Sequence, residues 1–151
     1  MTTPKKKKAV SRPQKPVEVS KSVGAVILNT KNQVLLVFQK KNKYWEFPKG
    51  KVENAETEIQ TLQREIEEET GIKRFRMAKR FRKVMYYNFQ YKGRTIQRRV
   101  VYFLIKTADR VRISDEHTEY AWVPLERAKE RLKHKNQINL IDQVIQRITK
   151  K

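Results

Sequence analysis

The sequence predicts a single domain of the mixed α/β class. Two continuous apolar runs, residues 23–28 and 34–38, are separated by a short polar segment, which predicts two adjacent strands buried on both faces. Ile59, Leu62 and Ile66 instead recur at spacings of three and four, which indicates an amphipathic helix. A chain of 151 residues is long enough for one domain with a hydrophobic core.

Local patterns predict the remaining elements. An aromatic-rich stretch and a stretch that ends in an apolar run flank Lys92-Gly93, a dipeptide typical of hairpin turns. A last strand, a short helix and an amphipathic terminal helix complete the chain. These five elements are predicted at residues 79–91, 94–106, 120–123, 125–132 and 138–148. His134, in a basic linker before the last helix, is expected to be a solvated residue.

The first 21 residues differ from the rest of the chain. They contain four consecutive lysines, Lys5 to Lys8, three prolines and almost no large apolar side chains. This composition predicts a disordered basic tail, with the domain at residues 22–151. The tail could tether RNA or another polyanion, or it could be a solubilising extension without a defined partner.

The charge of the chain is unevenly distributed. The net charge is +20, yet residues 50–72 hold seven acidic and only two basic side chains. An acidic segment inside a basic field suits a protein that attracts phosphate-rich ligands, either small molecules or nucleic acid. The absence of cysteine excludes disulfides and zinc–thiolate sites. Without an apolar run of membrane-spanning length or a signal peptide, we expect a cytoplasmic protein with no membrane partner. The sequence leaves monomer and dimer open.

The acidic segment is predicted to be a loop that leads into the amphipathic helix. Asn54 is the expected N-cap, and Gly71 stands where a left-handed C-cap would end the helix. Glu65, Glu68 and Glu69 recur at helical spacing and therefore share a stripe next to the apolar one. Like charges at these spacings repel each other, so the cluster is costly unless a cation lies beside it. Mg²⁺ prefers such oxygen ligands, so the three glutamates could form a magnesium site. The simpler interpretation is that they form an acidic helix face exposed to solvent.

The fixed residues of this segment, in order and spacing, resemble the signature of the Nudix hydrolase family. The matching residues are Gly50, Glu56, Arg64, Glu65, Ile66, Glu68, Glu69, Gly71 and Ile72. The resemblance covers about residues 22–149 and implies an α/β/α sandwich around a mixed β-sheet. It also implies hydrolysis of a nucleoside diphosphate linked to a further group X, at a pyrophosphate bond, with Mg²⁺ or Mn²⁺ as cofactor.

The same resemblance implies roles for individual residues. Glu65, Glu68 and Glu69 would be metal ligands, together with the backbone carbonyl of Lys49. Glu65 could also be the catalytic base. Glu56 and Arg64 are similar to the family's supporting pair, because an arginine can hold a glutamate by a bidentate contact.

Two segments outside the signature are similar to the diadenosine tetraphosphate hydrolase branch of the family. They are Trp45-Glu-Phe-Pro-Lys-Gly-Lys-Val-Glu53 and Ser114-Asp-Glu-His-Thr-Glu-Tyr-Ala-Trp122. The second makes Glu116 a further expected metal ligand or base. Tyr44 stands where that branch has a histidine. Tyr86 or Tyr87 is the expected adenine-stacking residue, and Tyr44 could stack on a base or cap the core. The expected phosphate contacts are Lys49 and Arg98 or Arg99.

The resemblance favours a hydrolase that converts diadenosine tetraphosphate to ATP and AMP. Capped or triphosphorylated RNA, oxidised nucleotides, ADP-ribose and diphosphoinositol phosphates are alternative substrates for the same chemistry. An alternative of another class is a catalytically silent protein that uses the fold to bind nucleic acid. Basic residues interleaved with tyrosines at residues 79–99 could bind single-stranded nucleic acid, and the simpler alternative is a hairpin with a polar outer half.

Overall fold

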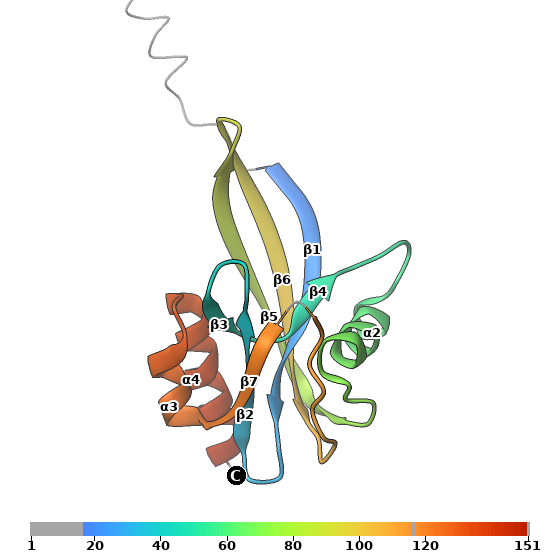
Figure 1. The fold of residues 1–151 in the computed structure, drawn as a ribbon, viewed down its shortest axis with the longest axis vertical. Coiled ribbons are helices and arrows are strands. Elements are labelled where there is room, and N and C mark those ends of the chain that lie inside the picture. The colour runs from blue at the N-terminus through green and yellow to red at the C-terminus, as the bar shows by residue number, and fades with distance from the viewer. Residues whose placement is uncertain (1–16, 116, 151) are drawn as a thin grey trace, which may run out of the picture.

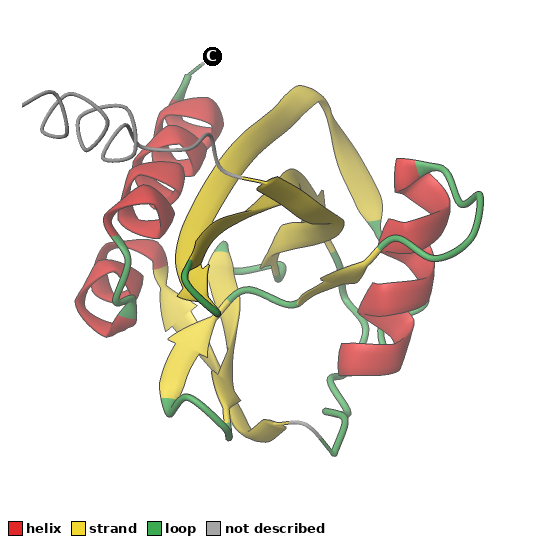
Figure 2. Cartoon of the chain, turned by 90° about the horizontal axis from the view of Figure 1, so that it is seen from above, coloured by secondary structure: helices red, strands yellow, loops and turns green. Residues whose placement is uncertain are grey.

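The predicted fold class is confirmed. The computed structural model describes residues 17–115 and 117–150, and in it a seven-stranded mixed sheet lies between helix α2 on one face and helices α3 and α4 on the other (Figure 1, Figure 2). The strands are β1 (Val17–Leu28), β2 (Gln33–Gln39), β3 (Tyr44–Glu46), β4 (Lys49–Lys51), β5 (Arg76–Tyr91), β6 (Arg94–Lys106) and β7 (His117–Pro124). The helices are α2 (Glu58–Thr70), α3 (Leu125–Arg131) and α4 (Lys135–Thr149).

Strands β1 and β6 form the centre of the sheet and pair in parallel, and the other strand pairs are antiparallel. The apolar run at residues 23–28 is buried throughout, as its continuous hydrophobicity predicts. Strand β1 begins at Val17, where it pairs with Ile96. Residues 17–21, assigned above to the tail, are therefore part of the sheet, because their backbone pairs with β6. Residues 1–16 lie outside the described part of the chain.

The core has one layer on each side of the sheet. On the α2 side, Leu62 and Ile66 pack against β1 and β6. On the other side, Leu140 and Val144 of α4 pack against the sheet together with side chains of α3. Ile59, predicted to share the apolar stripe of α2, is instead 40% exposed. The buried face of α2 includes Glu65 and Glu69 in its place, so the acidic and apolar stripes overlap.

At the ends of α2, the predicted N-cap is wrong and the predicted C-cap is confirmed. The N-cap is Thr57 rather than Asn54, which lies in the preceding loop with φ of 50°. Thr57 Oγ1 accepts the Gln60 backbone N–H at 3.1 Å, and Gln60 Oε1 accepts the Thr57 N–H at 2.8 Å. This reciprocal capping box satisfies two backbone donors, which one asparagine cannot do. Gly71 ends the helix with φ of 74°, as predicted.

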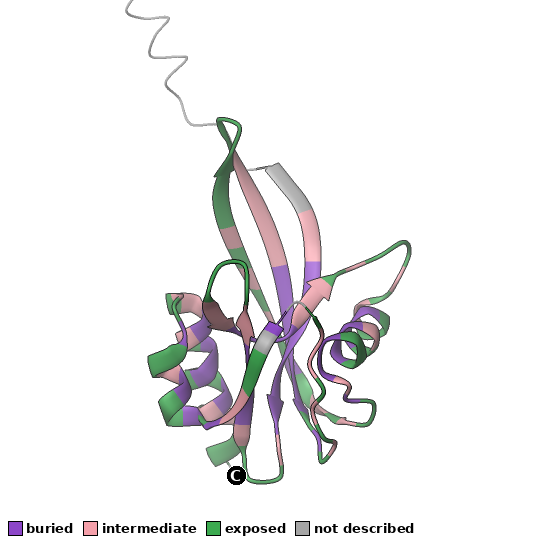
Figure 3. Ribbon diagram, viewed as in Figure 1, coloured by how far each residue is buried: buried purple, intermediate pink, exposed green. Residues whose placement is uncertain are grey.

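The short strands β3 and β4 were not predicted. Each has three residues, too few to show an alternating pattern. β3 pairs with the neighbouring β2, whereas β4 pairs with β1, which lies farther away in the sequence. The hairpin turn at Lys92-Gly93 is confirmed, since both residues have positive φ. The ribbon that ends in this turn extends past the helices, and Figure 3 shows that its far end is half-buried or exposed. No helix in the described part of the chain is long and apolar enough to cross a membrane.

The exposure of Ile59 gives a test of this packing. We expect Leu62→Ala to lower the free energy of unfolding by about 2–5 kcal/mol, because it leaves a cavity beneath the sheet. Ile59→Ala, in the same helix, should cost less than about 1 kcal/mol. Urea denaturation of both variants measures the difference, and equal losses would contradict the assignment of the buried face.

Candidate functional site

Strand β4 places a glycine directly beneath the first glutamate of the acidic cluster. Gly50 pairs with Val23 of the central strand, which fixes its position against α2. A Cβ atom at residue 50 would lie 1.8 Å from the carboxyl carbon of Glu65 and 2.1 Å from both its oxygens. Only glycine leaves room for that carboxylate, which is nearly buried between helix and strand.

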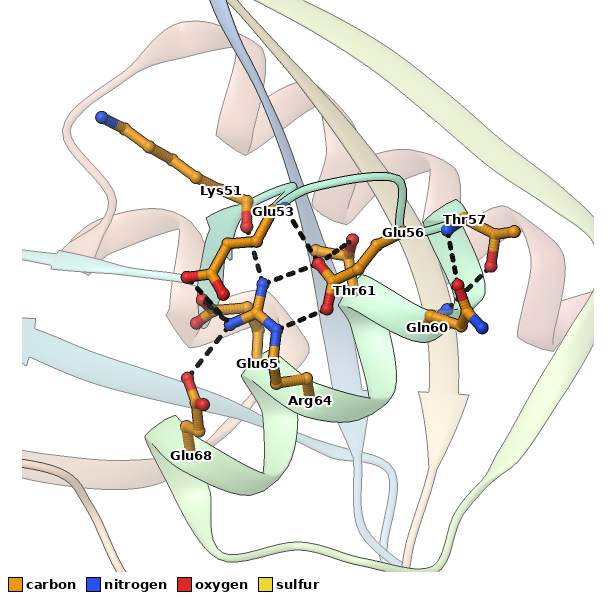
Figure 4. A network of polar contacts seen from close by, with 9 residues as sticks. All are labelled: Lys51, Glu53, Glu56, Thr57, Gln60, Thr61, Arg64, Glu65 and Glu68. Carbon is orange, nitrogen blue, oxygen red and sulfur yellow. Dashed lines mark hydrogen bonds and ion pairs between the residues drawn. The ribbon is translucent and has the colours of Figure 1, made fainter.

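The guanidinium of Arg64 lies at the centre of the polar contacts around this carboxylate (Figure 4). Its Nε and Nη2 donate to the two oxygens of Glu56, at 2.7 and 2.9 Å. Its Nη1 donates to Glu65 at 2.9 Å and to Glu68 at 3.2 Å. Nη2 also donates to the Lys51 carbonyl at 2.8 Å, which ties the helix to β4. The structure thus shows the pairing of Glu56 with Arg64 that the sequence predicts.

These contacts change the protonation of both partners. Hydrogen bonds from Arg64, and then the backbone N–H of Glu53, lower the pKa of Glu56 to about 2. The Glu56 carboxylate raises the pKa of the Arg64 guanidinium above its usual range. Both groups are therefore charged at neutral pH, and Arg64 is held rigidly beside two glutamates of the cluster.

The third glutamate of the cluster points to different partners. Glu69 Oε1 lies 3.2 Å from His117 Nδ1, and Glu69 Oε2 accepts the hydroxyl of Ser114 at 3.4 Å. The other ring nitrogen of His117 lies 3.3 Å from Glu46 Oε2, and Glu46 Oε1 lies 3.2 Å from Lys49 Nζ. His117 and both carboxylates are buried. A polar chain from Lys49 to Glu69 therefore runs through the sheet.

Sequence reasoning did not identify Glu46 or His117 as site residues. Burial alone would raise the pKa of Glu46, but its hydrogen bond with His117 and the charge of Lys49 outweigh burial and lower the pKa below its usual 4.5. Glu46 lies in the first and His117 in the second of the two segments that resemble the diadenosine tetraphosphate hydrolase branch, so the sequence did contain a signal for both residues. What the sequence does not show is that these segments meet.

The structure brings the glutamates to one helix but does not arrange them around one point. Within residues 17–115 and 117–150, no group of three acidic or histidine side chains is positioned to hold a metal ion as it stands. Glu68 is exposed and bonded to Arg64, whereas Glu69 faces His117. Glu116, the predicted additional ligand or base, lies outside the described residues. The carboxylate oxygens of the cluster fit a hard divalent cation chemically, provided that side chains turn from their present partners.

A cavity of about 710 Å³ lies beside this site. Five of the six predicted substrate-binding residues line it, and Arg99 does not. The five are Tyr44, Lys49, Tyr86, Tyr87 and Arg98. Of the two arginine candidates, Arg98 is therefore the one placed to contact a ligand in this cavity. A depression of similar volume, about 720 Å³, surrounds Asp109 at another end of the sheet and contains none of the predicted site residues.

The N-cap residue and the first turn of helix α4 contribute two cavity residues that sequence reasoning missed, His134 and Gln137. The ring of His134 lies edge-on to Tyr44 and Tyr87, with centroids 5.7 and 5.9 Å away. His134 is thus part of an aromatic cluster and not merely a solvated linker residue. Gln137 is 2% exposed, and its Oε1 has no partner among the described residues. Burial raises the pKa of Tyr87 to about 12, so its phenol stays neutral and can donate a hydrogen bond.

Comparisons with known proteins agree with this geometry. A family model for the NUDIX domain matches residues 19–144. The asymmetrical bis(5'-nucleosyl)-tetraphosphatases of Mus musculus and Sus scrofa are 36% and 38% identical to the chain over 90 residues. Each match covers 56% of this chain and 58% of the relative, so the chain spans little more than half the length of these proteins.

Solved structures extend the likeness to most of the fold. An Ap4A hydrolase of C. elegans, in a binary complex, is similar with a TM-score of 0.77 and 27% identity, over 87% of this chain and 98% of that one. A MutT protein from Methanosarcina mazei Go1 is similar with a TM-score of 0.69 and 26% identity, over 91% and 99%.

The lowered pKa of Glu56 predicts how stability depends on pH. A carboxylate whose pKa is lowered on folding stabilises the protein above its usual pKa of 4.5, and this contribution is lost as the pH falls toward the folded value of about 2. We expect Glu56→Gln to lower Tm at pH 7, and the difference from the unaltered protein to shrink between pH 4.5 and pH 2. Thermal melts across this range measure it. A difference that stays constant would show that Arg64 does not hold Glu56 charged.

Proposed function

Because the chain belongs to the NUDIX family, we propose that it hydrolyses a phosphoanhydride bond in a nucleoside diphosphate linked to a further group. The substrate that we propose is a dinucleoside polyphosphate such as diadenosine tetraphosphate, which would give ATP and AMP. One observation carries the proposal. Lys49 and Gly50 are consecutive on β4, and they connect the two halves of the site. Lys49 lines the cavity, while Gly50 lies against the carboxylate of Glu65.

In this proposal Glu65, Glu68 and Glu69 hold Mg²⁺ or Mn²⁺, together with the Lys49 carbonyl and Glu116. The bound ion would neutralise charge on phosphate oxygens and acidify water. Glu65, or Glu116, accepts the proton of the attacking water. Arg64 fixes the orientation of Glu65 by the contact at 2.9 Å. Water would attack one phosphorus atom while its bond to the bridging oxygen breaks and that oxygen leaves with the second nucleotide product, so no covalent intermediate with the protein is needed.

The cavity supports a nucleotide as substrate. Tyr44 and Tyr87 contribute aromatic rings to the cavity lining, and Lys49 and Arg98 supply positive charge for phosphates. The choice of two adenosines rests on the relatives, the asymmetrical tetraphosphatases and the C. elegans Ap4A hydrolase. Capped or triphosphorylated RNA and oxidised nucleotides would use the same chemistry and are the competing substrates.

A substrate panel tests the proposal. The protein is incubated with Mg²⁺ and diadenosine tetraphosphate, an oxidised nucleoside triphosphate or 5′-triphosphorylated RNA, and the products are separated by ion-exchange chromatography. ATP plus AMP from the first substrate, at the highest kcat/KM, is the expected result. A preference for another compound would reject the dinucleotide, and no hydrolysis of any compound would reject the activity.

A matched pair of variants tests the acidic cluster in the same assay. Glu68→Gln should lower kcat by about a hundredfold or more, because it removes a proposed ligand and several kcal/mol of charge stabilisation. Glu67→Gln removes the same charge from the neighbouring, exposed position and should retain turnover. Equal losses in the two variants would indicate a general charge effect instead of a metal site.

The contact between His117 and Glu69 predicts a positioning role for this histidine. His117→Gln should weaken Mn²⁺ binding about 10–100-fold, the usual effect of losing a residue that orients a ligand. Electron paramagnetic resonance of free Mn²⁺ measures the affinity without any turnover, and a thermal melt monitors folding. Unchanged Mn²⁺ affinity in a folded variant would show that His117 only fills space between Glu46 and Glu69.

A further inference from the structure

The ribbon of β5 and β6 carries a surface that the proposed hydrolysis leaves largely unused. Residues 71–108 contain twelve lysines and arginines and no acidic residue. Strand β5 is also an edge strand of the sheet, so one side of the ribbon is not covered by another strand of the described chain. A surface of this kind attracts polyanions over a long range.

Aromatic and basic side chains alternate across one face of the ribbon. The register pairs Tyr87 with Arg98, Phe89 with Ile96 and Tyr91 with Arg94. Paired residues on antiparallel strands point to the same face, and every second residue shares that face. We call the six residues the aromatic ladder: Tyr87, Phe89 and Tyr91 on β5, and Arg94, Ile96 and Arg98 on β6.

The outer part of the ladder is open to solvent. Phe89 is 40% exposed and Tyr91 is 57% exposed, although large aromatic rings usually bury more of their surface. The guanidinium of Arg98 lies 5.4 Å from the ring centroid of Phe89, and Lys92 Nζ lies 5.2 Å from that of Tyr91. Rings with adjacent cations suit ligands that combine aromatic groups with phosphates.

The ladder begins inside the cavity of the proposed active site. Tyr87, Phe89 and Arg98 line that cavity, and Tyr91 continues the same face toward the hairpin turn. Successive rings are separated by two residues, about 6.8 Å along a strand, which is twice the ~3.4 Å rise between stacked bases. Bases of one strand could therefore stack on successive rings if they were drawn apart from each other.

We propose that the aromatic ladder binds single-stranded nucleic acid and leads one end of it into the cavity at Tyr87. The rings stack on bases without regard to sequence, and Arg94 and Arg98 contact the phosphates. A duplex would not fit, because its bases are stacked on each other and unavailable to the rings. The inference goes beyond the proposed hydrolysis and does not depend on it, since binding needs neither metal nor turnover.

Fluorescence anisotropy with labelled 12-nucleotide RNA and DNA strands, in EDTA, tests the proposal on the full chain. We expect the double variant Phe89→Ala with Tyr91→Ala to bind a single strand at least about tenfold more weakly, the scale set by loss of base stacking. The exposed Tyr120 lies on β7, so Tyr120→Ala is the matched control and should bind as the unaltered protein does. Arg94→Gln should reduce the salt dependence of binding by about one phosphate contact.

Two results would overturn the inference. Equal affinity for duplex and single strand, with no effect of the double variant, would show that the basic charge alone attracts polyanions. Binding to anionic lipid vesicles but not to oligonucleotides would assign the ribbon to a membrane surface instead. Because the basic N-terminal residues are present in every variant, they do not affect the comparison. The single variant Tyr91→Ala, which lies outside the cavity, should retain hydrolysis of a dinucleotide while it binds a single strand more weakly, and this separates the result from the proposed function.

Discussion

Repulsion among carboxylates on a single helix is the constraint around which the site is built. Glu65, Glu68 and Glu69 lie on neighbouring turns of α2, where like charges destabilise a helix. The structure offsets this cost with protein groups. Arg64 contacts the first two carboxylates, and His117 with Ser114 contacts the third. The acidic cluster alone therefore does not require a metal ion, and the assignment of one rests on the family.

The same contacts join the two halves of the molecule. Arg64 bonds the Lys51 carbonyl and so anchors α2 to β4, whereas Glu46 and His117 connect that helix to the cavity on the other side of the sheet. A ligand that displaces Lys49 from Glu46 would change the surroundings of His117, and through it those of Glu69. Lys49, Glu46, His117 and Glu69 thus form a continuous chain of polar contacts between the cavity and the acidic cluster.

Much of this fold can be predicted from the sequence, because the sequence patterns that indicate its elements are local. The buried runs of β1 and β2, the turn at Lys92-Gly93 and the C-cap at Gly71 each depend on residues close together in the chain. Apart from the N-cap of α2, which is a local error, the errors concern contacts between distant segments. The early start of β1 depends on its pairing with β6, and β4 exists because it pairs with β1. Likewise, the exposure of Ile59 and the meeting of Glu46 with His117 are set by packing that no short pattern encodes.

The close fit of Gly50 beneath Glu65 also offers a way to silence the site without altering its electrostatics. A single methyl group at residue 50 would collide with the carboxylate and push it out of place, while every charged side chain of the molecule is kept. Replacing a glutamate, in contrast, makes an already cationic protein more cationic. An inert form that still attracts polyanions to the same degree is therefore better made by substituting Gly50 than by substituting any glutamate of the motif.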